Sequence, residues 1–312
     1  MSAPDRSAAA VSRRIFAVFV VRIGAAIIGV VNAFVLARLL GPSGKGDFYL
    51  VQLVPSTLLV LGQIGLPSAI SYYAGRGQMR GLARRSLILA LGLSLAGMVI
   101  TIASLPLLMS TLFREVSQDL VLVALAIVPF VYMFTFGNAI LTGRQRVAIY
   151  GAVALGQVIL ALLLFLVLIG ALGLGVGGAI LAYLGYSMAA GIAVTVASLL
   201  TPVDRDAGVA PWRSIFHYGL RLYPASLSGF FSYRADVYLL ALLGTSSEQL
   251  GFYSIAVASP SCCSSCPISV VTVFFPHVAG GTREEADNQA GVVTRVTIAA
   301  TGSPRCRWPS PR

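Results

Sequence analysis

The stretch IFAVFVVRIGAAIIGVVNAFVLARLL (residues 15–40) decides the fold class of this chain. Only two of its 26 residues are charged, Arg22 and Arg38. A bilayer core needs about 20 apolar residues in helical form, so this stretch is long enough to cross a membrane. It is too long for the apolar region of a cleavable signal, and no small-residue cleavage site precedes a polar region. The sequence therefore predicts a retained transmembrane helix.

Seven further apolar stretches follow the first. Hydrophobic residues make up 57% of the 312 residues and charged residues only 11%, and the mean hydropathy is +0.86. A soluble domain carries about 25% charged residues. We predict an all-α, polytopic transmembrane helix bundle of about eight helices plus the start of a ninth. The later helices are expected at 47–73, 86–112, 119–142, 148–170, 178–200, 214–243 and 247–275, and the ninth begins near 291.

The basic residues between these helices lie mainly in alternate connections. Twelve arginines fall on one side of the predicted membrane, and only Lys45 and Arg114 fall on the other. Because arginine is disfavoured in translocated loops, the twelve-residue side, with the N-terminus, is predicted to be cytoplasmic. This placement accounts for the net charge of +11 without a nucleic-acid partner. The twelve are Arg6, Arg13, Arg14, Arg76, Arg80, Arg84, Arg85, Arg144, Arg146, Arg205, Arg213 and Arg283.

A short motif recurs six predicted helices apart. Leu-Leu-Gly at 39–41 is followed by Phe-Tyr at 48–49, and Leu-Leu-Gly at 242–244 is followed by Phe-Tyr at 252–253. Both copies end a helix that starts on the predicted cytoplasmic side, so the repeat is parallel, about an axis along the membrane normal. Repeats of this kind build many secondary transporters, with the substrate path between the two halves.

Four segments carry a family resemblance. ARLLGP (37–42), GDFY (46–49) and GQIGLPSA (62–69) resemble the opening hairpin of polysaccharide flippases, and VFFP (273–276) resembles a later helix of the same family. These flippases belong to the MOP superfamily, which also holds the lipid II flippases and the MATE exporters. The resemblance implies two six-helix lobes and transport by alternating access.

The cargo implied by the resemblance is a lipid-linked oligosaccharide. The intact protein would move it, on undecaprenyl diphosphate, across the cytoplasmic membrane for polysaccharide biosynthesis. A coupling ion, H⁺ or Na⁺, is left open. Two alternatives remain at this point, a MATE-like exporter of small cations and a non-functional fragment of a flippase.

No enzyme is predicted, because neither His217 nor His277 has a nucleophile and an acid around it. No cofactor is expected either.

The C-terminal segment departs from the family pattern. Pro260, Cys262, Cys263, Cys266 and Pro267 interrupt what should be the apolar middle of the eighth helix. A zinc site would need a fourth ligand and usually paired Cys-x-x-Cys units, so no metal site is predicted. A frameshifted or truncated gene accounts better for this segment and for the residues that follow it.

These observations together divide the chain. The expected parts are a cytoplasmic N-terminal tail (1–14), an N-terminal six-helix lobe (15–200), a cytoplasmic linker (201–213), a partial C-terminal lobe (214–300) and an out-of-frame tail (301–312).

Charged residues inside the predicted helices are the candidate site. Arg22 lies 19 residues before Gly41 and Arg221 lies 23 before Gly244, a difference of about one helical turn. Each lobe thus offers an arginine from an equivalent helix, and Arg234 lies deeper along the seventh helix. A guanidinium binds phosphate in a bidentate fork, so the three are predicted to bind the diphosphate of the substrate. Alternatively, Arg22 and Arg221 extend to lipid phosphates at the membrane edge.

Two further sets of polar residues have alternative roles. Asp236 is the one acid inside a predicted span, where it either pairs with an arginine or binds a coupling cation. Gln52, Ser56 and Gln63 fall within about 40° of one another on an ideal helix. Such a stripe either lines the cavity or holds neighbouring helices together.

Overall fold

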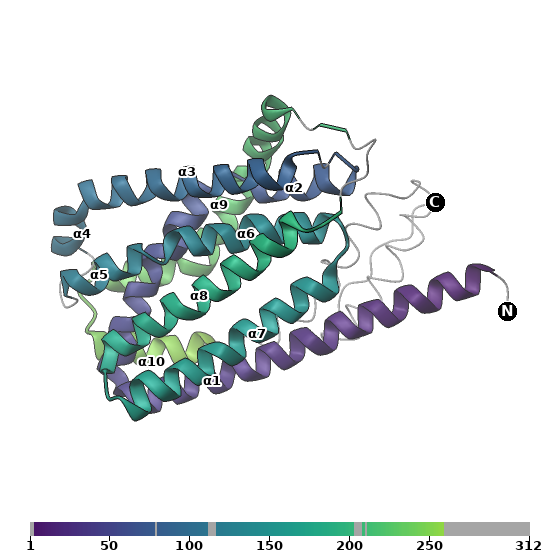
Figure 1. The fold of residues 1–312 in the computed structure, drawn as a ribbon. Helices are drawn as coiled ribbons and strands as arrows, with labels where there is room; N and C mark the ends of the chain where they lie inside the picture. The colour runs from purple at the N-terminus through teal and green to yellow at the C-terminus, as the bar shows by residue number, and fades with distance from the viewer. Residues whose placement is uncertain (1–2, 79, 112–116, 203–207, 210, 259–312) are drawn as a thin grey trace, which may run out of the picture.

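The computed structural model describes residues 3–78, 80–111, 117–202, 208–209 and 211–258. Helices account for most of these residues, and Figure 1 shows them gathered in one bundle, as the sequence predicts. The helices are α1 (Ala3–Gly62), α2 (Leu66–Gly75), α3 (Leu82–Ala103), α4 (Leu105–Thr111), α5 (Gln118–Leu125), α6 (Val128–Gly143), α7 (Val147–Phe165), the π-helical η1 (Leu166–Ala171), α8 (Gly175–Leu199), α9 (Trp212–Leu242) and α10 (Ser247–Ala258).

Five helical segments of the described residues are long and apolar enough to cross a bilayer. They are Gly24–Gly62, Leu82–Ala103, Gln118–Gly143, Ala148–Ala171 and Gly175–Leu199. The first spans 39 residues and bends at Gly41, so it contains one predicted helix and most of a second. Helix α9 occupies the predicted 214–243 but is not among the five, because Arg213, Arg221, Arg234 and Asp236 recur along it. The chain is a multi-pass membrane protein.

Most of the predicted N-terminal tail is helical in the structure. Residues 3–14 continue α1 without a break, because alanines are strong helix formers and no glycine or proline interrupts the segment after Pro4. The later half of the predicted helix 247–275 lies outside the described residues, as do the four cysteines.

Both copies of Leu-Leu-Gly end in a glycine with a positive φ. Gly41 has a φ of 71° and Gly244 a φ of 75°, values in the left-handed region that glycine adopts at little cost. At Gly41 the axis of α1 bends, and Figure 1 shows the helix continuing toward α2. Gly244 separates α9 from α10 in the corresponding place. The positive φ at this position explains why a glycine ends both copies of the repeat.

The segments that follow these glycines pack against each other. A Cβ atom built at Gly46 of α1 would overlap the carbonyl oxygen of Ser247 in α10, and one at Gly251 would overlap that of Pro42. Each segment thus presents a glycine to the backbone of the other. Small residues allow such close approach between membrane helices. We call this contact the α1–α10 crossing.

The predicted helix 47–73 is wrong as a continuous helix. It breaks between Gly62 and Leu66, where Ile64 and Gly65 have φ values of 48° and 66° and Pro67 lacks an N–H donor. Tyrosines from other helices satisfy nearby carbonyls. The Tyr132 hydroxyl donates to Leu58 O at 2.5 Å, and the Tyr223 hydroxyl donates to Leu61 O at 2.9 Å. A break at membrane depth needs such donors because lipid offers none.

Smaller interruptions divide three other predicted helices. Ser104 separates α3 from α4 within 86–112, residues 126–127 separate α5 from α6 within 119–142, and η1 ends the predicted 148–170. Pro106 and Pro129 follow the first two interruptions closely, and proline cannot donate the backbone hydrogen bond that a continuous helix requires.

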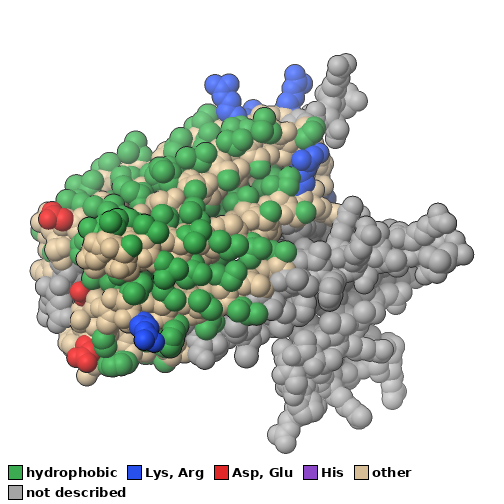
Figure 2. Space-filling view, turned by 60° about the horizontal axis from the view of Figure 1, so that its bottom comes forward, with side chains coloured by type: hydrophobic (Ala, Val, Ile, Leu, Met, Phe, Trp, Pro, Cys, Tyr) green, Lys and Arg blue, Asp and Glu red, His purple; other side chains and the backbone are tan. Residues whose placement is uncertain are grey.

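The two ends of the bundle differ in charge. Figure 1 shows the N-terminus and the α2–α3 and α6–α7 turns at one end, and the bend of α1 and the α7–α8 turn at the other. Figure 2 shows the acidic side chains of the visible face gathered at one end and most of the basic ones at the other. The structure thus collects the loop arginines at one end, as the alternation predicts. This arginine-rich end carries Arg76, Arg80, Arg84, Arg85, Arg144, Arg146 and Arg213.

Candidate functional site

The half-buried Arg234 of α9 contacts the first copy of the repeat. Its guanidinium donates to the hydroxyl of Tyr49 at 3.3 Å, and its Cζ lies 5.6 Å from the centre of the Tyr49 ring. Tyr49 is buried in the returning part of α1. Within the described residues, Arg234 makes no ion pair with a carboxylate. A guanidinium has five N–H groups, and the hydrogen bond to Tyr49 uses one of them.

The carboxylate of Asp236 is held by the second copy of the repeat. It accepts a short hydrogen bond from the Tyr253 hydroxyl and another from the backbone N–H of Val237 at 2.8 Å. Residues two apart on a helix do not face each other, and Asp236 makes no ion pair with Arg234. The predicted ion pair therefore finds no arginine partner among the described residues, although both carboxylate oxygens have donors.

Tyr49 and Tyr253 are the tyrosines of the two Phe-Tyr pairs. The repeat thus places one tyrosine against the positive group and the other against the negative group of α9. We call Tyr49, Arg234, Asp236 and Tyr253 the central cluster. Nearby, the Tyr238 hydroxyl makes a short hydrogen bond with Thr57, which ties α9 to α1 beside the cluster.

The other two predicted arginines lie away from the central cluster. Arg221 is exposed on α9 and precedes Arg234 by thirteen positions, which is about 20 Å along a helix axis. The side chain of Arg22 lies outside the described residues, but its helix passes beside α7, where a Cβ atom at Gly151 would lie 3.2 Å from Val21. The structure therefore does not bring the three arginines together around one ligand.

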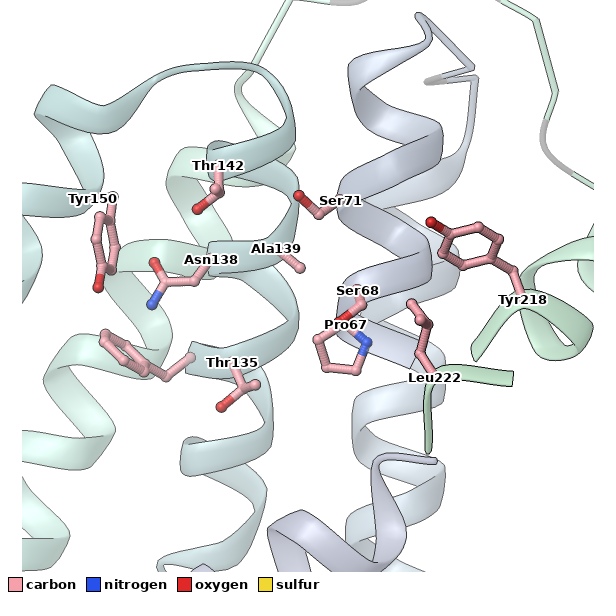
Figure 3. A pocket seen from close by; sticks show the side chains of 11 residues that line it. Pro67, Ser68, Ser71, Thr135, Asn138, Ala139, Thr142, Tyr150, Tyr218 and Leu222 are labelled. Atoms are coloured by element: carbon pink, nitrogen blue, oxygen red, sulfur yellow. The ribbon is translucent and has the colours of Figure 1, made fainter. Parts of the chain in front are cut away.

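A cavity of about 530 Å³ lies between α2, α6, α7 and α9, beside the α6–α7 turn. Figure 3 shows Thr135, Asn138 and Thr142 projecting from α6 and the amide of Asn138 extending toward Tyr150 of α7. We call this space the α6 cavity. Its lining consists of Pro67, Ser68, Ser71, Phe134, Thr135, Asn138, Ala139, Thr142, Tyr150, Tyr218 and Leu222.

Sequence reasoning missed the α6 cavity, although the sequence contains a signal for it. Thr135, Asn138 and Thr142 have the spacing of one helical face inside an otherwise apolar helix. Ser68 and Ser71 repeat this pattern on α2. Neither stripe alone indicates a cavity, because only the tertiary structure shows that the two helices face the same space.

Comparison with known families connects this geometry to a class of protein. The model of the family described as polysaccharide biosynthesis protein matches residues 11–280. This chain belongs to that family. The match covers both copies of the repeat and the central cluster, so the predicted membership of a polysaccharide biosynthesis family is confirmed. The comparison with curated proteins gives no match.

Solved structures with the fold of this polysaccharide biosynthesis protein are MOP superfamily transporters. A MATE protein in the bent conformation aligns with a TM-score of 0.66 and 19% identity over 93% of this chain and 70% of that one. An outward-facing multidrug resistance MATE transporter aligns with a TM-score of 0.66 and 17% identity, over 92% of this chain and 69% of that one. A MOP superfamily transporter from Pyrococcus furiosus aligns with a TM-score of 0.63 and 18% identity, over 93% of this chain and 70% of that one. It is described as having a binding pocket of reverse polarity. At these identities the likeness establishes the fold.

Two residues of the predicted polar stripe of this polysaccharide biosynthesis protein lie on α1, and the third follows the end of that helix directly. Gln52 and Ser56 lie half-buried on α1, but Gln63 lies beyond the end of α1 in the break before α2. The Ser56 hydroxyl bonds to the backbone oxygens of Gln52 and Leu53, both at 3.0 Å. The backbone N–H of Gln63 still donates to Leu59 O at 2.9 Å, as in a helix, so the stripe stays a prediction.

Proposed function

We propose that this protein translocates a lipid-linked oligosaccharide across the cytoplasmic membrane, with the diphosphate passing close to Arg234. The observation that carries the proposal is a half-buried guanidinium that hydrogen-bonds a tyrosine and, among the residues that the structure describes, makes no ion pair with a carboxylate. An arginine inside a membrane normally faces a partner or a wet cavity. A diphosphate would supply the missing negative charge through bidentate hydrogen bonds.

The state of Asp236 favours this cargo over a small cation. Its carboxylate already accepts from Tyr253 and Val237 within the second repeat, whereas the guanidinium of Arg234 retains unused donors. A cation exporter needs the reverse arrangement, with a free acid and a satisfied base. The match to a polysaccharide biosynthesis family points in the same direction.

The spacing of the arginines suggests successive binding steps. Arg22 and Arg221 belong to the parts of α1 and α9 nearer the arginine-rich end, and Arg234 lies about 20 Å farther along α9. We infer that the diphosphate meets Arg22 or Arg221 first and Arg234 later. If the arginine-rich end is cytoplasmic, as the positive-inside rule requires, this order runs from the inner to the outer leaflet.

The test uses vesicles that contain a fluorescent undecaprenyl-diphosphate-linked sugar and the reconstituted protein. Dithionite quenches only outer-leaflet label, so the rate at which inner-leaflet label becomes quenchable measures translocation. We expect the wild type to exceed protein-free vesicles, and Arg234→Ala to lower the rate about 10- to 100-fold, because a charge-assisted hydrogen bond contributes about 1.5–3 kcal/mol. Arg234→Lys should recover part of that loss, since a point charge replaces a fork.

The matched control is Arg38→Ala, which removes an exposed arginine of α1 away from the cluster. It should leave the rate near that of the wild type. Equal rates for Arg234→Ala and the wild type, at equal amounts of folded protein, would refute the role of Arg234. A wild-type rate no higher than that of protein-free vesicles would refute the proposed function.

A further inference from the structure

The α6 cavity has a lining that differs chemically from the central cluster. Seven of its lining residues carry a neutral hydroxyl or amide group, and none of the eleven is charged. An anion would find no cationic partner there, and a cation would find no carboxylate. The seven are Ser68, Ser71, Thr135, Asn138, Thr142, Tyr150 and Tyr218.

Two of these groups can accept hydrogen bonds that the protein does not supply. The Oδ1 atom of Asn138 is buried and has no hydrogen-bond partner in the structure. Thr135 uses its hydroxyl proton on Val131 O at 2.9 Å, which leaves its oxygen as an acceptor. A buried acceptor without a donor is costly, by about 1–3 kcal/mol. A ligand rich in hydroxyl groups would satisfy both atoms.

Aromatic rings complete the lining. Phe134, Tyr150 and Tyr218 contribute apolar faces beside the hydroxyls. Tyr218 is held in place by Tyr72, whose ring stacks on it at 4.6 Å with an angle of 13° between the planes. The guanidinium of Arg76 lies 4.9 Å from the centre of the Tyr72 ring on the same stack. An apolar ring face beside fixed polar groups matches a pyranose, which has hydroxyls at its edge and C–H bonds on its faces.

The position of the cavity agrees with a glycolipid whose diphosphate lies at the arginines. Arg221 lies on α9 between Tyr218 and Leu222, which both line the cavity. Tyr150 precedes Gly151, where α7 passes beside α1 next to Arg22. Arg221 therefore belongs to a helix that lines the cavity, and Arg22 belongs to a helix that packs against the lining helix α7. Its volume of about 530 Å³ is that of a small-molecule site rather than of a long glycan.

We propose that the α6 cavity binds the lipid-proximal sugar of the substrate while the diphosphate lies beside Arg221. This inference rests on the proposed function and adds a subsite for a neutral, polyhydroxylated group. Ser68, Asn138 and Thr135 would hydrogen-bond the sugar, and Tyr218 would contact a face of its ring. The arginines recognise the charge that every diphosphate lipid carries, so the α6 cavity is where one sugar is distinguished from another.

The experiment measures dissociation constants of the purified protein in nanodiscs for four lipids. They are farnesyl diphosphate without a sugar and the same lipid bearing N-acetylglucosamine, glucose or galactose. We expect at least one glycolipid to bind the wild type about tenfold more tightly than the bare lipid. Asn138→Leu and Thr135→Val should each reduce this sugar-dependent ratio about fivefold, because each removes hydrogen bonds to the sugar. Affinity for the bare lipid should not change.

Thr101→Val and Asn32→Leu are matched controls. Thr101 donates to Gly97 O within α3, and Asn32 donates to Val158 O between α1 and α7. Neither residue lines the cavity, so both variants should keep the wild-type ratio. The subsite is refuted if no glycolipid binds more tightly than the bare lipid, or if both cavity variants keep the full ratio.

Two arginine variants separate this inference from the proposed function. Arg221→Gln and Arg234→Gln act on the diphosphate, so at least one should weaken the bare lipid and the glycolipid by the same factor, about tenfold. If neither variant weakens the bare lipid, the proposed anion path is wrong, whatever the sugar does. If they weaken it while the cavity variants change nothing, the anion path holds and the sugar subsite alone is refuted.

Discussion

The contact between Tyr132 and the end of α1 allows a quantitative test of the helix break. Tyr132 is fully buried, and its hydroxyl donates to Leu58 O at 2.5 Å. The same hydroxyl occupies the space that a Cβ atom on Gly62 would need. Tyr132→Phe should therefore lower the free energy of unfolding by about 1 kcal/mol, the usual contribution of a neutral hydrogen bond. Gly62→Ala should cost about 1–3 kcal/mol through overpacking.

The double variant should not show the sum of these losses. Once the hydroxyl is removed in Tyr132→Phe, the methyl group of Gly62→Ala has space to occupy. We therefore expect the double variant to be no less stable than Gly62→Ala alone, with a coupling energy of about 1 kcal/mol or more between the two sites. Equilibrium unfolding of the purified protein in mixed detergent micelles, followed by circular dichroism, measures all four free energies.

A matched pair controls for the loss of a tyrosine hydroxyl and for the extra methyl group. Tyr150→Phe removes a hydroxyl that lines the α6 cavity, and Gly29→Ala adds a methyl group where no atom lies within 4 Å. Each control should change stability by less than about 0.5 kcal/mol. Additive losses in Tyr132→Phe and Gly62→Ala would refute the account of the break, because they would mean that the two groups do not share one space.

Two other consequences of the fold can be checked directly. Gly46→Leu should lower the melting temperature in detergent by several degrees, because its side chain would meet the Ser247 carbonyl at the α1–α10 crossing. Gly29→Leu, which adds the same side chain where no atom lies within 4 Å, should not lower it. Equal melting temperatures for the two variants would show that the crossing is not close-packed. In whole cells, a cysteine at Ser43 should react with an impermeant maleimide and one at Gln78 should not, because positive charge keeps the arginine-rich end in the cytoplasm. The opposite labelling pattern would reverse the proposed orientation.

Local sequence was enough to predict the membrane-protein class, the bundle and the sidedness of the charge. Each depends on a property that a single segment carries by itself, such as the apolar length of residues 15–40 or the arginines around residue 80. The Leu-Leu-Gly repeat also predicted corresponding turns, because a left-handed backbone at Gly41 and Gly244 is a local preference of glycine.

The break between Gly62 and Leu66 was not predictable from the same kind of signal. Glycine and proline within membrane helices are compatible with a straight helix, a kink or a break. The outcome depends on donors from elsewhere in the chain, and here Tyr132 of α6 and Tyr223 of α9 supply them.

The sequence by itself determined which residues carry charge inside the membrane helices, and only the tertiary structure decided what each of them contacts. Asp236 was expected to pair with an arginine or to bind a coupling cation, but its carboxylate and the guanidinium of Arg234 contact tyrosines of different copies of the repeat. The α6 cavity likewise depends on α2 and α9, which lie far from α6 and α7 in the chain. Residue type and spacing follow from covalent order, whereas a cavity and a partner exist only after segments distant in sequence have packed together.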